Sequence, residues 1–183
     1  MTIPVLVAAL VAIFIFGCTI PELARSTRVA PAGEPISYYL TGPRHLYEVA
    51  GFCAMSLALL LLSTQLGPAG ATLAAVIAAA VIMAAVSDTW RGLLGKHHRA
   101  IHLVAAGTAF LIAFVLELLV SIRTGSVLLS VVTAVYPAAV GFIYWEWPLA
   151  TAWQEKAAAS SICLWLVAWA VRAIVAALTG VSL

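Results

Sequence analysis

Six long, uninterrupted apolar runs occupy most of this 183-residue chain. A helix needs about 20 residues to cross a membrane, because the hydrocarbon layer is about 30 Å thick and each residue adds about 1.5 Å. The runs reach that length and are too continuous for the alternating strands of a membrane barrel. The sequence therefore predicts an all-α polytopic membrane protein, with six transmembrane helices in one bundle. The runs are 3–20, 49–66, 71–88, 100–122, 127–145 and 157–179.

Composition excludes the other broad classes of protein. Hydrophobic residues make up 64% of the chain and charged residues 9%, against about 45–50% and about 25% in soluble domains. So few charges cannot cover a water-soluble core, and so apolar a chain is not disordered. The net charge of +2 gives no reason to expect a nucleic-acid partner. With no internal repeat, the sequence predicts a single domain over residues 1–183.

Charged residues gather on three connections, 21–48, 89–99 and 146–156, which share one side of a six-helix bundle. We call this side the wet face. It carries seven of the nine Lys and Arg residues, whereas the connections on the other side carry only Arg123. The positive-inside rule then predicts that the wet face is cytoplasmic, in a bacterial inner membrane, and that both termini lie outside.

Two histidines, His98 and His102, stand one helical turn apart where the fourth run begins. This spacing lets two imidazoles reach one metal ion, and Asp88, His97 or His45 are candidates for a third ligand. Histidine pairs at a membrane boundary more often make hydrogen bonds, and the sequence holds no HExxH motif and no paired cysteines. We therefore predict no metal and no other cofactor.

Two charged residues fall deep inside the predicted helices, Glu117 in the fourth run and Arg172 in the sixth. Both runs lead away from the wet face, and the rise per residue puts the two side chains within about 3 Å of the same depth. Either charge alone is costly to bury in a membrane. We predict an ion pair between Glu117 and Arg172 that clamps the two helices; a role in proton transfer is the alternative.

Acidic groups near the wet face also allow an enzymatic interpretation. Glu146 lies between Trp145 and Trp147, and an acid flanked by aromatic faces can protonate an alkene and stabilise a carbocation. Asp88 and His102 are further candidates for acid–base catalysis. The alternative function is thus a membrane-embedded enzyme that acts on a prenyl, terpenoid or other lipid-soluble substrate. The simpler explanation of the tryptophans is an aromatic belt at the membrane boundary.

The long connection 21–48 ends in a segment rich in proline and tyrosine. Arg44 and His45, with Arg91 from the next wet-face connection, are placed to contact the phosphate of a lipid headgroup. The competing interpretation is a structured loop that carries only the positive-inside charge. On the first interpretation, membrane lipids are the partner of this protein.

The third run is a ladder of alanines, with small residues four positions apart on several faces. Small side chains let helices approach closely. This helix is therefore predicted to be central in the bundle or to pack on another membrane-protein subunit. The second possibility favours an accessory subunit of a larger membrane complex.

Three stretches of the sequence carry a family likeness. They are Ile36-Ser37-x-x-Leu40-x-Gly42-Pro43, Asp88…His98-x-x-x-His102, and Gln154-Glu155-Lys156 before a Trp-containing final run. Together they resemble the bacterial six-helix membrane families of the Frag1/DRAM/Sfk1 type, over nearly the whole chain. The resemblance implies a six-helix bundle and no particular reaction. Frag1-type relatives are associated with lipid anchors and membrane trafficking, and such proteins are drawn with cytoplasmic termini, opposite to the orientation that the charges predict.

Taken together, these features predict a small integral membrane protein that binds lipid or serves as an accessory subunit of a larger membrane complex. The membrane-embedded enzyme is the alternative. A proton-coupled carrier that uses Glu117 and Arg172 is a third possibility, against which stands the lack of an inverted repeat.

Overall fold

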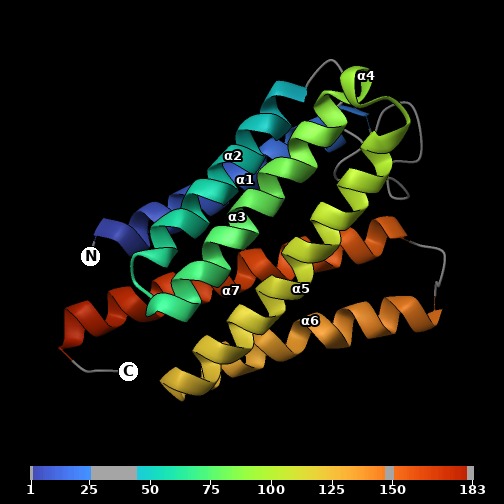
Figure 1. Cartoon of the computed structure of the whole chain (residues 1–183). Coiled ribbons are helices and arrows are strands. Elements are labelled where there is room, and N and C mark those ends of the chain that lie inside the picture. The colour runs from blue at the N-terminus through green and yellow to red at the C-terminus, as the bar shows by residue number, and fades with distance from the viewer. Residues whose placement is uncertain (1, 26–44, 147–150, 181–183) are drawn as a thin grey trace.

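A computed structural model describes residues 2–25, 45–146 and 151–180, except for the side chains of residues 20–25, 88, 91, 136, 140–146 and 151–154. Every regular element in this part of the chain is a helix, which confirms the predicted all-α fold class (Figure 1). The elements are α1 (Thr2–Arg25), α2 (His45–Ser63), α3 (Pro68–Thr89), α4 (Arg91–Leu94), the 3-10 turn η3 (Gly95–His97), α5 (His98–Thr124), α6 (Val127–Glu146) and α7 (Thr151–Thr179).

Among the described residues, five helices, α1, α2, α3, α5 and α7, are long and apolar enough to cross a membrane. Helix α6 has 20 residues, but its apolar part, Val127–Ala139, is shorter, and Pro137 lies inside it. It packs on α7 (Figure 1). The chain is therefore a multi-pass membrane protein built as a helical bundle.

The helices form a closed ring in which each long helix packs on the next one along the chain and α7 returns to α1. Figure 1 shows α1, α2 and α3 side by side, with α6 and α7 along the opposite side and α5 between the two groups. The ring encloses the core, and α5 also contacts α7 across it.

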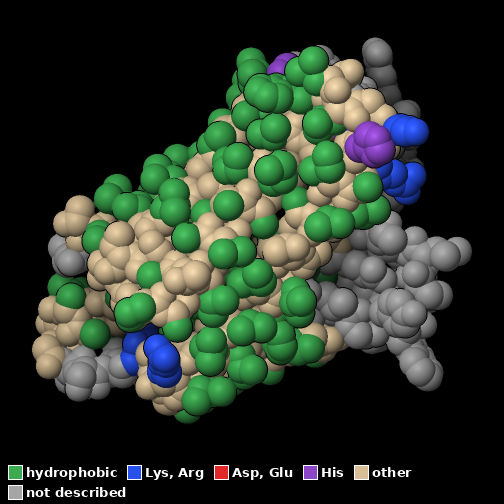
Figure 2. Space-filling view, in the orientation of Figure 1, with side chains coloured by type: hydrophobic (Ala, Val, Ile, Leu, Met, Phe, Trp, Pro, Cys, Tyr) green, Lys and Arg blue, Asp and Glu red, His purple; other side chains and the backbone are tan. Residues whose placement is uncertain are grey.

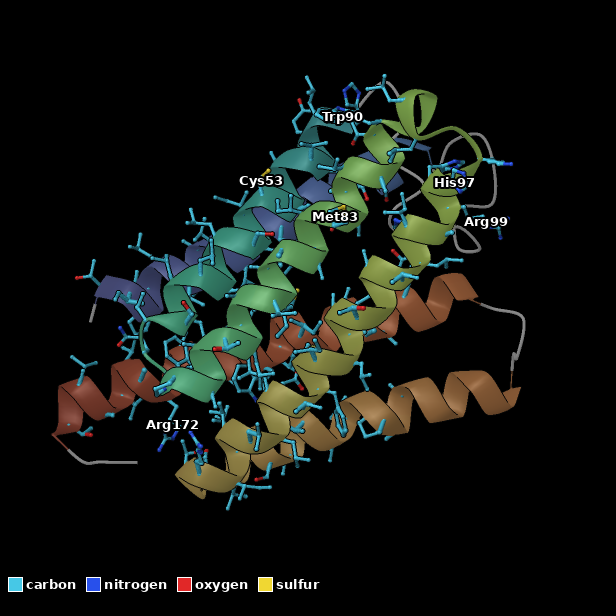
Figure 3. All side chains as sticks on the ribbon, in the orientation of Figure 1. Cys53, Met83, Trp90, His97, Arg99 and Arg172 are labelled. Carbon is cyan, nitrogen blue, oxygen red and sulfur yellow. The ribbon has the colours of Figure 1, made fainter. Side chains whose placement is uncertain are left out.

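Several polar and charged side chains lie at the two ends of this bundle. Figure 3 places His97 and Arg99 at one end and Arg172 at the other. On the face shown in Figure 2, hydrophobic side chains cover the surface between two groups of Lys and Arg. Leu103, Leu111 and Ile122 of α5 are each more than 60% exposed, as expected of side chains that contact lipid.

The closest helix contact is between α1 and α2 and depends on two glycines. A Cβ atom at Gly17 would collide with the carbonyl oxygen of Tyr47 and lie 3.0 Å from the Cα of Gly51. A Cβ at Gly51 would lie 3.2 Å from the carbonyl oxygen of Phe14. Glycine permits this approach because it has no side chain, and in a membrane such packing is a main source of helix association.

The connections between helices differ slightly from the predicted ones. Helix α2 begins at His45 and ends at Ser63, whereas the predicted run is 49–66. The first turn of the helix includes Glu48, which is fully buried. Helix α3 then starts at Pro68, where the missing N–H of proline costs no hydrogen bond. Helix α5 ends at Thr124 and is capped by Gly125, whose φ of 59° is left-handed and suits glycine.

One face of the alanine ladder is turned into the bundle, whereas Ala75 and Ala79 are exposed on the outer face. Helix α3 packs between α2 and α5, and its buried residues include Ala74, Ala78 and Ala84. The hydroxyl of Ser56 on α2 donates to the carbonyl oxygen of Ala78 at 3.1 Å. These contacts make α3 one member of the ring, between α2 and α5. Packing of its outer face on another subunit stays a prediction.

Candidate functional site

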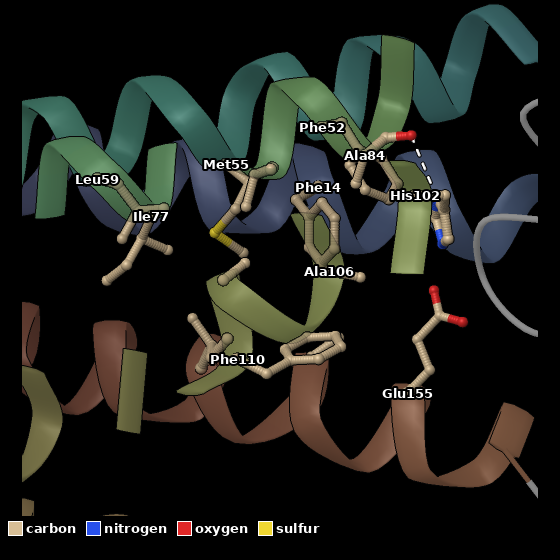
Figure 4. Close-up of a pocket in the computed structure, with 14 residues that line it drawn as sticks. Phe14, Phe52, Met55, Leu59, Ile77, Ala84, His102, Ala106, Phe110 and Glu155 are labelled. Carbon is tan, nitrogen blue, oxygen red and sulfur yellow. Dashed lines mark hydrogen bonds between the residues drawn. The ribbon is translucent and has the colours of Figure 1, made fainter. Parts of the chain in front are cut away.

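A narrow apolar cavity lies inside the ring, near its wet-face end. Residues of α1, α2, α3, α5 and α7 line it (Figure 4). Phe14, Phe52, Met55 and Phe110 give it an apolar wall, and Phe14 meets Phe52 edge to face with ring centroids 5.6 Å apart. A mostly apolar cavity with a few polar groups is the usual form of a ligand site.

Two titratable side chains, His102 of α5 and Glu155 of α7, supply the polar end of this cavity. His102 is only 9% exposed, and its Nδ1 lies 3.2 Å from the carbonyl oxygen of Ala84 on α3. Because a carbonyl oxygen only accepts, Nδ1 carries the hydrogen of this bond. The Glu155 carboxylate points toward the imidazole from the facing helix (Figure 4). The fold thus brings an acid and a base from two helices to one end of the cavity.

The size of the cavity limits what it can hold. Its volume is about 50 Å³, roughly a third of the 150 Å³ cavity that admits benzene in a protein interior. A prenyl or terpenoid substrate is far larger than benzene. The cavity beside His102 is therefore too small for a prenyl or terpenoid substrate. Such a substrate would enter only if the helices separated.

A larger depression lies on the outside of the ring, between α1 and α7. Its volume is about 590 Å³, within the range of about 300–1,000 Å³ typical of small-molecule sites. We call it the α1–α7 groove, and its lining residues are Phe14, Ile15, Cys18, Thr19, Lys156, Ala159, Ser160, Cys163, Leu164 and Val167.

The α1–α7 groove faces the surroundings of the bundle and not its interior. Ile15 is 46% exposed and Leu164 49% exposed, and both stand at its walls. The buried side chains Phe14, Ala159 and Cys163 form its floor. Phe14 and Ala159 also line the interior cavity, so a single layer of side chains separates the two spaces.

The groove is about as long as one membrane leaflet is thick. Lys156 lies at its wet-face end and Val167 deeper in the membrane, eleven residues further along α7. That separation corresponds to about 16 Å along a helix, close to half of the hydrocarbon layer of about 30 Å.

The predicted ion pair is absent from the structure. Among the described residues, no ion pair joins Glu117 to Arg172, and Oε2 of Glu117 has no hydrogen-bond partner. The prediction matched the two charges in depth only. Their helices, α5 and α7, contact each other across the ring at few positions, since α5 packs mainly on α3. Equal depth on two helices does not bring their side chains together.

The two histidines proposed as metal ligands both bond to backbone. Nδ1 of His98 donates to the carbonyl oxygen of Gly95 at 2.7 Å, and His102 bonds to Ala84. Within the described ranges, no group of three His, Cys, Asp or Glu residues is arranged to hold a metal ion.

Several predicted site residues fall outside the described part of the structure. Arg44 lies in an undescribed connection, and the side chains of Asp88, Arg91 and Glu146 are not described. His45 is the first residue of α2 and is half-buried. The headgroup site made of Arg44, His45 and Arg91, and the acid–base roles of Asp88 and Glu146, stay predictions.

Sequence reasoning missed two components of the site. Glu155 entered only as part of the family resemblance, because an acid at the start of a helix gives no sign of facing an interior cavity. The α1–α7 groove was also missed, since it depends on how two helices distant in sequence meet. The one available signal was Lys156, a cation at the wet-face end of an apolar run.

Comparisons with family models, with curated proteins and with solved structures give no match to this chain. The resemblance to the Frag1/DRAM/Sfk1 type therefore stays a prediction.

Proposed function

We propose that this integral membrane protein binds a membrane lipid, with one acyl chain in the α1–α7 groove and an anionic headgroup at Lys156. The observation that carries the proposal is the groove itself, which is apolar, opens outward and has a cation at its wet-face end. Lipids are the molecules that surround such a surface.

Length and charge favour this occupant. An acyl chain of the wet-face leaflet extends over about the same depth as the groove, so the chain and the groove end together. A lysine near the membrane surface contributes about 1 kcal/mol to attraction of anionic lipid. The concentration of Lys and Arg on the wet face adds to this attraction in the same direction. If the positive-inside rule holds, the bound lipid belongs to the cytoplasmic leaflet.

An accessory role in a larger complex has less support. Part of the alanine ladder that favoured it is buried inside the chain, where α3 packs on α2 and α5. For His102, the enzymatic alternative is disfavoured by the small volume of the adjacent cavity.

Native mass spectrometry of the purified protein tests the lipid site directly. The protein in mild detergent is mixed with phosphatidylglycerol or phosphatidylcholine, and retained lipid is counted. We expect one phosphatidylglycerol to be retained preferentially. Ser160→Trp, which fills the groove, should abolish retention, and Lys156→Gln should reduce the preference for the anionic lipid about fivefold, the equivalent of about 1 kcal/mol.

Matched variants separate the groove from general effects. Ser130→Trp places the same side chain on an exposed position of α6, outside the groove, and Arg99→Gln removes one cation from an exposed position near the wet face. Ser130→Trp should retain lipid as the parent protein does, and Arg99→Gln should reduce the preference for the anionic lipid less than Lys156→Gln does. Equal retention by Ser160→Trp and Ser130→Trp would show that lipid does not occupy this groove.

A further inference from the structure

A second polar cluster lies in the half of the bundle away from the wet face. Glu117 and Ser121 of α5 are 3% and 2% exposed, and Thr133 of α6 is 4% exposed. The hydroxyl groups of Ser121 and Thr133 share a hydrogen bond of 3.0 Å. Glu117 precedes Ser121 by one helical turn, so both belong to the same face of α5. We call these three residues the oxygen cluster.

The carboxylate of Glu117 is the unsatisfied member of this cluster. Its Oε2 is buried and has no hydrogen-bond partner among the described residues. An unpaired carboxylate in a low-dielectric interior costs several kcal/mol. A buried group with that cost calls for a compensating positive charge.

Among the described residues, no side chain supplies this charge. The other charged residues in this half of the bundle are Arg123 on α5 and Arg172 on α7; α3 and α6 contribute none, since Asp88 and Glu146 lie at their wet-face ends. Neither arginine forms an ion pair with Glu117 in the described structure. Arg123 is exposed and extends to the α2–α3 connection, where its guanidinium lies 3.7 Å from the Cβ position of Gly67.

We propose that the oxygen cluster binds a small monovalent cation, Na⁺ or a proton, which neutralises Glu117 inside the membrane. The chemistry of the cluster selects for such an ion. Carboxylate and hydroxyl oxygens are hard ligands and suit hard cations, and a single carboxylate balances one positive charge. The cluster contains no sulfur or imidazole that would favour a transition metal.

This site goes beyond lipid binding and is distinct from the groove. Glu117 lies 19 residues along α5 from His98 at the wet-face end, which corresponds to about 28 Å. Occupation of the cluster joins α5 to α6 through Glu117, Ser121 and Thr133. Cation binding should therefore stabilise the hairpin formed by these two helices.

Thermal unfolding in detergent tests the proposal, with tryptophan fluorescence as the readout. The parent protein and Glu117→Gln are compared in NaCl and in N-methylglucamine chloride of equal ionic strength, each over a range of pH. If Na⁺ is the ligand, Na⁺ should raise the Tm of the parent by on the order of 3 °C for each tenfold increase above half-saturation. Glu117→Gln should abolish that rise.

If the ligand is a proton, the Tm of the parent protein should change with pH but not with Na⁺. Glu117→Gln should remove the pH dependence of the Tm. Loss of carboxyl bands from the infrared difference spectrum between low and high pH in this variant would assign the proton to Glu117.

Ser121→Ala and Thr133→Val keep the carboxylate and should weaken the Na⁺ effect or shift the pH response, whereas the exposed Ser130→Ala should not. If Glu117→Gln does not fold, Ser121→Ala and Thr133→Val test the proposal in its place. A parent protein that responds to neither Na⁺ nor pH, or variants that respond as the parent does, would overturn the proposal.

Discussion

Helix α1 contacts two neighbours, and the two contacts differ in how closely the backbones approach. Against α2, Gly17 and Gly51 bring the helices so near that neither position has room for a Cβ without movement. Against α7, the side chains of the two helices leave a groove of about 590 Å³. One helix therefore has a closed side and an open side.

The difference shows where a ligand can bind with little structural cost. At the closed side, backbone atoms fill the space, and an added atom displaces a helix. At the open side, the floor of the groove is formed by side chains that also line the interior cavity. The side chains of its walls are exposed to lipid. Phe14 belongs to both sides, since its carbonyl oxygen faces Gly51 and its ring lines the groove.

The largest effect is expected at the closed side. Gly17→Leu should destabilise the protein by about 3 kcal/mol or prevent folding, because the backbone of α2 must move to admit the side chain. Unfolding in mixed micelles with increasing dodecyl sulfate, followed by tryptophan fluorescence, measures this change. Gly107→Leu on α5, where a Cβ would meet nothing within 4 Å, is the matched control. Similar losses in both variants would contradict the close approach of α1 and α2.

An intermediate effect is expected at Phe14, the residue shared by both sides. Phe14→Ala should cost about 2 kcal/mol, less than the 3–5 kcal/mol typical of soluble cores, because the unfolded helices stay in lipid and only packing is lost. The substitution also joins the groove to the cavity, so retention of lipid with a longer chain should increase in native mass spectrometry. Phe16→Ala, at a position that is 66% exposed, should change neither quantity.

The smallest effect on stability is expected at the wall of the open side. Leu164→Ala should change the free energy of unfolding by no more than about 0.5 kcal/mol, since the side chain is 49% exposed and contacts lipid in both states. It should nevertheless weaken retention of phosphatidylglycerol, whereas Leu118→Ala on the lipid-exposed surface of α5 should not. A large loss of stability would show that α1 and α7 pack more tightly than the groove implies.

Much of the fold could be predicted from sequence, because the membrane sets the length of each helix. All six apolar runs correspond to helices, and their ends shift by only a few residues, as at His45 and Ser63. The turns were marked by Pro68 and Gly125, whose backbone preferences act locally.

The site was far less predictable, because it depends on which helix faces meet. The pairing of Glu117 with Arg172 was predicted from depth alone and failed, since depth says nothing about neighbours in the ring. His102 was identified as a candidate for metal binding or acid–base chemistry, but its partner Ala84 and the nearby Glu155 come from other helices. Gly17 and Gly51 gave no periodic signal that distinguishes them from other glycines.

The sequence by itself determined a multi-pass helical membrane protein, with the length of its helices and the concentration of charge on one side. These properties depend on each segment's own hydrophobicity and on the cost of placing charge in lipid. Only the tertiary structure decided that α1 is closed against α2 and open against α7, that His102 faces Glu155, and that Glu117 is buried without Arg172. Each of these depends on the rotation of one helix against another, which is set by packing between segments far apart in the chain.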